Sequence, residues 1–226
     1  MKISLFKKKK NKIVIFGSGG ISREIAFLIE DINKSCRSIQ FEILGFIEKD
    51  KSRLGCEISG YKILGDYSIL NHIKCDGYVL PMGNPIIKKK IYNEEIAKID
   101  KYLKAFNIIH PSVVFREKYV KLGIGNIICA GTILTSDILL GDFNLINLNC
   151  TIGHDVEIGN FNVINPLSAI SGNVRIGNNN LIGTGSKVIQ NLEIRNDIVI
   201  GAGAVVSKSI YEAGTYVGIP ARKIMN

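Results

Sequence analysis

Aliphatic residues recur at every sixth position along the second half of the chain. A period of six matches neither an amphipathic helix, with a period near 3.6, nor a simple strand, with a period of 2. A sustained six-residue repeat is typical of a parallel β-helix, in which each hexad forms one short side and points its aliphatic residue inward. Three hexads would close one triangular coil of eighteen residues. The series is unbroken and comprises Leu122, Ile128, Leu134, Leu140, Ile146, Ile152, Ile158, Ile164, Ile170, Ile176, Ile182, Val188, Ile194, Ile200 and Val206.

The fifth residue of each hexad sorts by side when the hexads are taken in threes. One column is an asparagine ladder, the next is small and the third is bulky and aliphatic. Stacked strands lie about 4.8 Å apart, a spacing at which amide side chains can hydrogen-bond along the stack. The sorting favours the triangular coil. The columns are Asn126, Asn144, Asn162, Asn180 and Ile198; Thr132, Cys150, Ser168, Ser186 and Ala204; and Ile138, Val156, Val174, Leu192 and Ile210.

One histidine stands within the repeat, at His154, and Asp155 follows it. The column of His154 also contains Ser136, Gly172, Gln190 and Lys208, so we expect the imidazole to face outward. Asp155 is less distinctive, because its column is rich in Asp and Asn, which are common at tight turns. Spacing alone does not decide the role of either residue. His154 is either a surface histidine or a functional group, and Asp155 is either a turn residue or a catalytic acidic residue.

The first hundred residues carry a different pattern, that of strands alternating with helices. A short apolar run at 13–16 precedes the glycine turn at 17–20, and apolar residues at helical spacing follow through Ile32. Further strands are predicted at 41–48, 77–83 and 106–111, with a helix over 86–99 whose "KKK" at 88–90 forms a solvated face. This order predicts a small α/β sheet of Rossmann character.

Glycine lets the backbone approach a ligand closely, and a helix N-terminus favours phosphate. The dinucleotide fingerprint G-x-G-x-x-G is incomplete, since Ser22 replaces its third glycine. A nucleotide, a nucleotide-linked sugar or a tight turn without ligand all remain open. We expect three parts: a basic tail at 1–11, the α/β domain at 12–110 and the β-helix at 111–226. We assign no role to His72 or His110.

Composition limits the remaining classes. A chain of 226 residues with 46% hydrophobic residues can form one or two domains with a sizeable core. Five scattered cysteines without a CxxC pair suit free thiols in the cytoplasm. The net charge of +9 arises largely from six lysines in the first twelve residues, and the remainder has 23 basic against 20 acidic residues. We therefore expect a solvated tail, with weak membrane-surface contact as the alternative, and no nucleic-acid partner.

The two halves together resemble the sugar O/N-acyltransferases, which include sialic acid O-acetyltransferases and N-acetyltransferases of UDP-4-amino-sugars. The resemblance rests on the "GSGG" turn followed by "IGHD", "SGNVRIG", "IGTGSKV", "IGAGAVV" and "YVGIPARKI", and it covers nearly the whole chain. It implies a left-handed β-helix that forms a homotrimer, with acetyl-CoA between neighbouring β-helices. It also implies a nucleotide-sugar at the N-terminal domain, and no metal.

The resemblance also implies roles for particular residues. His154 matches the general base and Asp155 the acid that polarises it, while Gly172 matches a position whose amide contacts the acetyl thioester. Positions near coenzyme A correspond to Thr184 and Ala202. Positions in the nucleotide-sugar pocket correspond to Gly19, Gly20, Glu48, Gly83 and Asn84.

This chain departs from the family pattern in three places. Ile21 stands where the glycine turn often continues with histidine, Glu48-Lys49 where an Asp-Asp pair is frequent, and Val163 where some members carry a second histidine. These departures bear on the identity of the sugar and nucleotide rather than on the chemistry.

The prediction is an acetyl-CoA-dependent acetyltransferase acting on a nucleotide-linked amino-sugar of the 4-amino-4,6-dideoxy type in bacterial glycan biosynthesis. The alternative is an O-acetyltransferase of sialic acid or another sugar. An NAD-dependent oxidoreductase leaves the hexads unexplained, and a γ-carbonic-anhydrase-like metal enzyme needs more histidines in the repeat than His154. A non-catalytic scaffold leaves His154 unexplained. Cys150 belongs to the small-residue column, so we favour packing over nucleophilic attack for its thiol.

Overall fold

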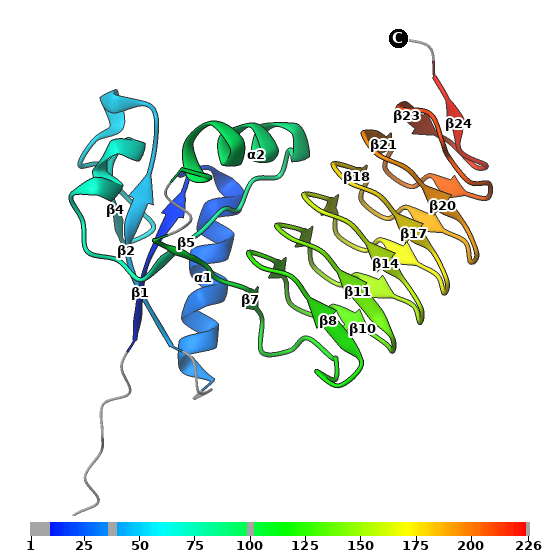
Figure 1. Ribbon diagram of the computed structural model, residues 1–226, viewed down its shortest axis with the longest axis horizontal. Coiled ribbons are helices and arrows are strands. Elements are labelled where there is room, and N and C mark those ends of the chain that lie inside the picture. The colour runs from blue at the N-terminus through cyan, green and yellow to red at the C-terminus, as the bar shows by residue number, and fades with distance from the viewer. Residues whose placement is uncertain (1–9, 36–39, 99–101, 225–226) are drawn as a thin grey trace, which may run out of the picture.

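The structure is a computed structural model that describes residues 10–35, 40–98 and 102–224. It has two parts joined end to end, an α/β domain and a long stack of triangular coils (Figure 1). This confirms the predicted fold class. Most of the predicted basic tail lies outside the described residues, and the predicted domain limits stay a prediction.

The α/β domain is built on one six-stranded sheet in the order β3-β4-β2-β1-β5-β6. Adjacent strands in this sheet are parallel, except that β3 and β4 form an antiparallel hairpin. The strands are β1 (Asn11–Phe16), β2 (Phe41–Ile47), β3 (Glu57–Ile58), β4 (Tyr61–Gly65), β5 (Gly77–Val79) and β6 (Lys104–Ala105). The helices are α1 (Gly20–Lys34), α2 (Pro85–Ile91), 3-10 turns at Lys51–Arg53 and Tyr67–Asn71, and a π-helical turn at Tyr92–Ile96.

The coils have three sides, each a parallel sheet. The side that meets the α/β domain, here the docking side, contains β7 (Ile108–Ile109), β9 (Ile127–Ile128), β12 (Leu145–Ile146), β15 (Val163–Ile164), β18 (Leu181–Ile182), β21 (Ile198–Ile200) and β23 (Gly214–Val217), with β24 (Arg222–Lys223) antiparallel at its end. The small-residue side contains β10 (Ile133–Leu134), β13 (Thr151–Ile152), β16 (Ala169–Ile170), β19 (Lys187–Val188) and β22 (Val205–Val206). The charged side contains β8 (Val120–Leu122), β11 (Ile138–Leu140), β14 (Glu157–Ile158), β17 (Arg175–Ile176) and β20 (Glu193–Ile194).

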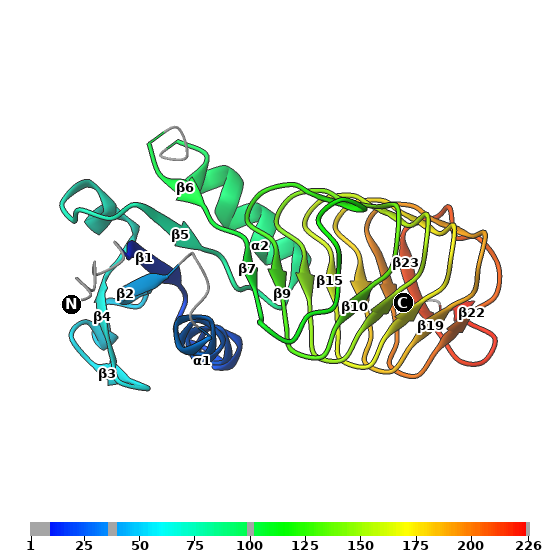
Figure 2. The same cartoon turned by 90° about the horizontal axis from the view of Figure 1, so that it is seen from below.

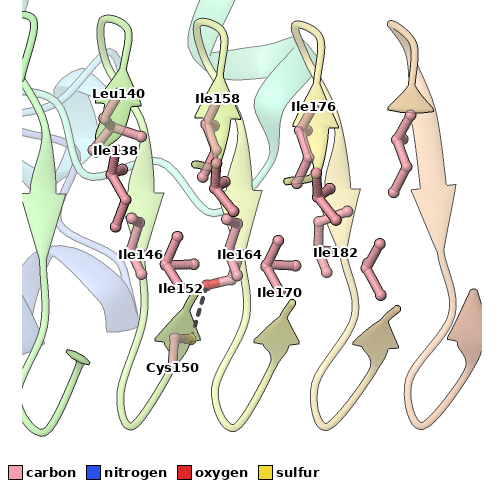
Figure 3. Close-up of a cluster of buried hydrophobic side chains, with 14 of the residues drawn as sticks. Ile138, Leu140, Ile146, Cys150, Ile152, Ile158, Ile164, Ile170, Ile176 and Ile182 are labelled. Atoms are coloured by element: carbon pink, nitrogen blue, oxygen red, sulfur yellow. Dashed lines mark hydrogen bonds between the residues drawn. The ribbon is translucent and has the colours of Figure 1, made fainter. Parts of the chain in front are cut away.

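The register confirms the eighteen-residue coil. Thr151 pairs with Ala169, and Ile152 pairs with Ile170. The aliphatic series fills the interior (Figure 3), and burying each such side chain stabilises the fold by roughly 1.5–3 kcal/mol. The asparagine ladder is also observed: Asn162 Nδ2 donates to Asn144 Oδ1 at 3.0 Å, and the Asn162 side chain is fully buried. The ladder ends at Asn180, whose Oδ1 accepts from the Ile198 amide at 2.8 Å and whose buried Nδ2 has no partner among the described residues.

The α/β domain packs on the docking side through apolar contacts. One buried cluster joins the inward face of α1, at Ile25 and Ile29, to Ile127, Leu145 and Val163 of the coils. In both views α1 and α2 lie beside the first coils (Figures 1 and 2). The outward residues of the first three coils on this side, Ile127, Leu145 and Val163, are thus buried between the two parts, whereas Leu181 and Val199 further along are only partly buried.

Three sequence predictions about this junction differ from the structure. The expected strand at 106–111 is not part of the α/β sheet, because Ile108 and Ile109 pair with β9 on the docking side. The expected solvated face at 88–90 is also incorrect in part. Lys88 is 1% exposed, since α2 packs this face against the coils, whereas Lys90 is exposed and pairs with Glu94 at 4.0 Å. The helix predicted to reach residue 99 changes to a π-helical turn at Tyr92.

Candidate active site

His154 and Asp155 lie at the corner where β13 turns into β14. Asp155 adopts a left-handed backbone (φ +57°), so its place in the turn is structural as the column suggested. Its carboxylate also contacts the imidazole: His154 Nδ1 lies 2.8 Å from Asp155 Oδ2. The two side chains are 66% and 60% exposed. Asp155 therefore serves both as turn residue and as the partner of the histidine.

Gly172 stacks directly on His154, one coil further along. A Cβ atom on Gly172 would lie 2.5 Å from His154 Nε2, so the ring occupies the space that any other residue would fill. The backbones are also tied, since the Asn173 amide donates to the His154 carbonyl at 2.8 Å. Among the described residues, no acceptor is bonded to the Gly172 amide. The eighteen-residue register had predicted this neighbour.

The arrangement can act as a base. A carboxylate that accepts the proton on Nδ1 fixes the neutral tautomer in which Nε2 carries the free lone pair. Nε2 is the nitrogen that lies against Gly172 and faces outward. A substrate group that gives its proton to Nε2 could therefore react at this exposed corner, within reach of the Gly172 amide as a hydrogen-bond donor.

The five predicted nucleotide-sugar residues follow the carboxyl ends of three adjacent strands. Gly19 and Gly20 follow β1, Glu48 follows β2, and Gly83 and Asn84 follow β5. Because β2 and β5 flank β1 on opposite sides, this edge is a topological switch point, where ligands of open α/β sheets bind. Gly19 is the N-cap of α1 and no side chain caps that end, which leaves its amides available to an anion.

Local contacts explain why the turn has this shape. Gly17 has a φ of +77°, which glycine adopts without strain. Ser22, which stands where the fingerprint has its third glycine, is buried and donates from Oγ to the Phe16 carbonyl at 3.2 Å. Glu48 Oε2 accepts from the Ser18 amide at 3.1 Å and from Ser18 Oγ at 2.8 Å. Sequence reasoning missed Ser18, and no motif signals it.

Asn84 has a structural function that the sequence could have revealed. Its Oδ1 accepts from the amides of Ile86 and Ile87 at 3.0 and 3.1 Å, and it is thus the N-cap of α2. Asparagine before a proline at the first helical position is a standard start signal. Gly83 beside it is open, since a Cβ there would meet no atom within 4 Å.

Thr184 and Ala202 lie at a different corner, where the docking side turns into the small-residue side. They stack eighteen residues apart, and the Gly203 amide donates to the Thr184 carbonyl at 2.8 Å. Both are exposed. Within one chain they are separated from His154 by the whole width of the small-residue side.

His154 is also separated from the nucleotide-sugar edge. The α/β domain covers the docking side, and the corner of His154 is the one opposite that side. The structure thus brings together His154, Asp155 and Gly172, and separately the five residues of the switch point. It does not bring the two groups together in one chain.

Other candidate groups differ in their surroundings. Burial raises the pKa of the Cys150 thiol to about 11. Its Sγ lies 3.2 Å from the Asn165 carbonyl and 3.9 Å from the Ile164 carbonyl, the contact drawn in Figure 3, which fits a packing role. His110, to which no role was assigned, lies 3.5 Å from Asp31 through Nε2. It lines a hollow of about 500 Å³ between α1 and the coils, which also contains Gly20 and Leu148. A shallower hollow of about 830 Å³ on the charged side contains none of the predicted site residues.

Neither a metal cluster nor a membrane helix is found among residues 10–35, 40–98 and 102–224. No group of three or more His, Cys, Asp or Glu in these ranges could hold a metal ion. No helix formed by them is long and apolar enough to cross a membrane.

Known proteins resemble both the α/β domain and the coils of this chain. The model of the PglD N-terminal domain family matches residues 12–94. Among curated proteins, no sequence shows a significant match. The acetyltransferase domain of PglB from Neisseria gonorrhoeae FA1090, solved with acetyl coenzyme A, is 25% identical with a TM-score of 0.83, covering 96% of this chain and 100% of that one.

Two further solved structures are similar over nearly their full length. WeeI from Acinetobacter baumannii AYE is 25% identical with a TM-score of 0.78, covering 94% of this chain and 99% of its own. A perosamine N-acetyltransferase from Caulobacter crescentus, solved with CoA and GDP-perosamine, is 24% identical with a TM-score of 0.84, covering 95% and 97%. Residues 12–94 therefore match the PglD N-terminal domain family, and over nearly its whole length the chain is similar to solved hexapeptide-repeat sugar acetyltransferases.

Proposed function

We propose that the chain transfers an acetyl group from acetyl-CoA to the amino group of a nucleotide-linked amino-sugar of the 4-amino-4,6-dideoxy type, in bacterial glycan biosynthesis. The observation that carries the proposal is the imidazole of His154, held between the Asp155 carboxylate and the bare backbone of Gly172. The PglB domain was solved with acetyl coenzyme A, and the Caulobacter protein with CoA and GDP-perosamine, which supports both substrate classes.

In the proposed reaction the sugar nitrogen attacks the thioester carbonyl carbon directly. His154 Nε2 accepts the proton that the nitrogen loses, and the Gly172 amide stabilises the oxyanion of the tetrahedral intermediate. Collapse of the intermediate breaks the C–S bond and releases CoA as thiolate, which takes the proton from His154. General-base assistance is typically worth about 10²–10⁴-fold in rate. No acyl-enzyme forms, in keeping with the buried Cys150.

The acceptor would bind at the switch point of the α/β sheet. The amides at the start of α1 offer donors to its phosphates, and Gly19, Gly20 and Gly83 leave room for close approach. Glu48 and Asn84 shape the two flanks of this edge. The hollow beside Gly20 and His110 offers space for the sugar that the nucleotide carries.

We further propose a homotrimer, because one chain separates the groups that the reaction needs. His154 lies at the corner opposite the docking side, whereas the acceptor edge and the Thr184–Ala202 corner adjoin that side. A neighbouring copy that presents its His154 corner would complete the site, with coenzyme A running along Thr184 and Ala202. The outward positions of the small-residue side are Ile133, Thr151, Ala169, Lys187 and Val205. Of these, Thr151 and Ala169 are short enough for a second coil to approach closely beside the His154 corner. The cytoplasmic location stays a prediction.

The test is release of free thiol from acetyl-CoA with UDP-, GDP- and dTDP-linked 4-amino-sugars and with free sialic acid. We expect turnover of one amino-sugar that falls by at least about 100-fold in His154→Ala. The matched control is His72→Ala, an exposed histidine in the α/β domain. Turnover of sialic acid alone would favour the O-acetyltransferase alternative, and no turnover with any acceptor would contradict the proposal.

A further inference from the structure

Lys88 is a buried lysine at the junction of the two parts. Its side chain is 1% exposed, and its Nζ donates to the main-chain carbonyl of Phe143 at 3.0 Å. Lysine is almost never fully buried without a partner, because removing its charge from water is costly. Its neighbours Lys89 and Lys90 in the same helix are exposed. A role specific to position 88 is therefore indicated.

The acceptor of this hydrogen bond stands in an unusual turn. Phe143 and Phe161 occupy the same corner of successive coils, where the charged side meets the docking side, with φ values of +53° and +58°. Bulky residues rarely adopt this left-handed conformation. The two rings stack with centroids 5.3 Å apart, and the Tyr92 ring lies 4.6 Å from Phe143. The strained turn is thus the surface on which α2 docks.

The same helix begins at the predicted acceptor edge. Asn84 caps α2 with its side chain, and the Lys88 amide donates to the Asn84 carbonyl at 2.9 Å. Lys88 therefore lies one helical turn beyond Gly83 and Asn84. A shift of α2 on the coils would move this loop relative to Gly19 and Gly20, which are held by β1.

We infer that Lys88 is a positioning residue that fixes α2 on the Phe143 turn and thereby holds the Gly83–Asn84 loop in place for the nucleotide part of the acceptor. The inference rests on the proposed function for the identity of the acceptor. Because its side chain is buried against the coils, Lys88 is not placed to contact either substrate. Its effect is transmitted through the first turn of α2, so acceptor binding depends on it and acetyl-CoA binding does not.

The test compares Lys88→Met, which fills the space without a donor, with Lys88→Arg, which keeps donors and charge. Lys89→Met is the matched control, because it makes the same change at the next, exposed position. For Lys88→Met we expect the KM of the nucleotide-sugar to rise about tenfold, equivalent to about 1.4 kcal/mol, with kcat and the KM of acetyl-CoA within about twofold. Lys88→Arg is expected to recover most of this loss.

Hydrogen exchange gives a second measurement that needs no activity. The amides of residues 86–91 should exchange about tenfold faster in Lys88→Met, while those of β12 and β15 keep their rates. An unchanged acceptor KM with unchanged exchange would overturn the inference. So would an equal loss of affinity for both substrates with a lower Tm, which would indicate general destabilisation. If the wild type acetylates no acceptor, the proposed function fails, and the exchange rates alone decide whether Lys88 anchors α2.

Discussion

Replacing Gly172 with alanine should prevent His154 from acting as general base without disturbing the fold. The added Cβ would lie 2.5 Å from His154 Nε2, 2.6 Å from Cε1 and 3.0 Å from Cδ2. All three atoms belong to the exposed end of a flexible side chain, so the imidazole can rotate away at little cost in stability. Rotation breaks the 2.8 Å contact with Asp155 and removes Nε2 from the site. The alanine keeps the amide N–H, so the oxyanion donor remains.

The expected loss in kcat is therefore that of the base alone, about 10²–10⁴-fold, with the Tm within about 2 °C of the wild type. The double variant Gly172→Ala/His154→Ala should lose no more than about threefold beyond His154→Ala. The implied coupling free energy is about 2.7–5.5 kcal/mol. Gly60→Ala, in the hairpin of β3 and β4, is a useful contrast, because its Cβ would meet no atom within 4 Å but its φ is +80°, so it should lower stability and leave kcat unchanged.

Steady-state thiol release on the two single variants and the double variant measures this cycle. Wild-type kcat in Gly172→Ala would refute the stacked geometry. Losses that multiply in the double variant would show that Gly172 and His154 act independently, which would contradict the proposed site.

Three further predictions follow from buried groups. Burial lowers the pKa of Lys88 from 10.5 to about 7, so the unfolded chain binds more protons between these values and the free energy of unfolding rises with pH, by up to about 1.4 kcal/mol per unit. Because the native lysine is half protonated at pH 7, the stability of the wild type relative to Lys88→Met should increase by about 2.3 kcal/mol between urea titrations at pH 7 and pH 9. Asn162→Ala should cost about 2–4 kcal/mol, because the Asn180 amide loses its 2.9 Å acceptor inside the ladder, and a loss below 0.5 kcal/mol would contradict this. Cys150→Ser should leave kcat within about twofold, and alkylation of the native protein should modify the exposed Cys56 before the buried Cys150. Rapid alkylation of Cys150 with loss of activity would instead support a role for Cys150 as nucleophile.

The β-helix could be predicted in detail because the repeat in the sequence determines its register. A six-residue period fixes which side chains point inward, and the sorting of the fifth positions fixes how coils stack. The contact between His154 and Gly172 follows from that register alone. The contact between His154 and Asp155 could not be derived from the register. Aspartate is expected at a left-handed turn and also as the partner of a catalytic histidine, so its presence does not distinguish the two roles.

The junction of the two parts could not be predicted in the same way. "KKK" at 88–90 gives no local sign that one lysine is buried, because that depends on which face of α2 meets coils more than fifty residues away. The strand at Ile108 was assigned to the wrong sheet for a related reason. Its apolar pattern suits either partner, and only the path of the chain decides between them.

Three departures from local rules lie at this junction, and one more, Leu167 with a φ of +62°, lies at the corner between the docking side and the small-residue side. A buried lysine and two phenylalanines in left-handed turns each carry a cost, and the coils elsewhere place Gly, Asn or Asp at most such turns. Because sequences usually violate local preferences where function requires it, the cluster points to α2 as an element whose position matters. The acceptor loop is the only predicted site segment that α2 carries among the described residues. The orientation of one helix on the coils therefore links the scaffold of the β-helix to the binding of the nucleotide-sugar.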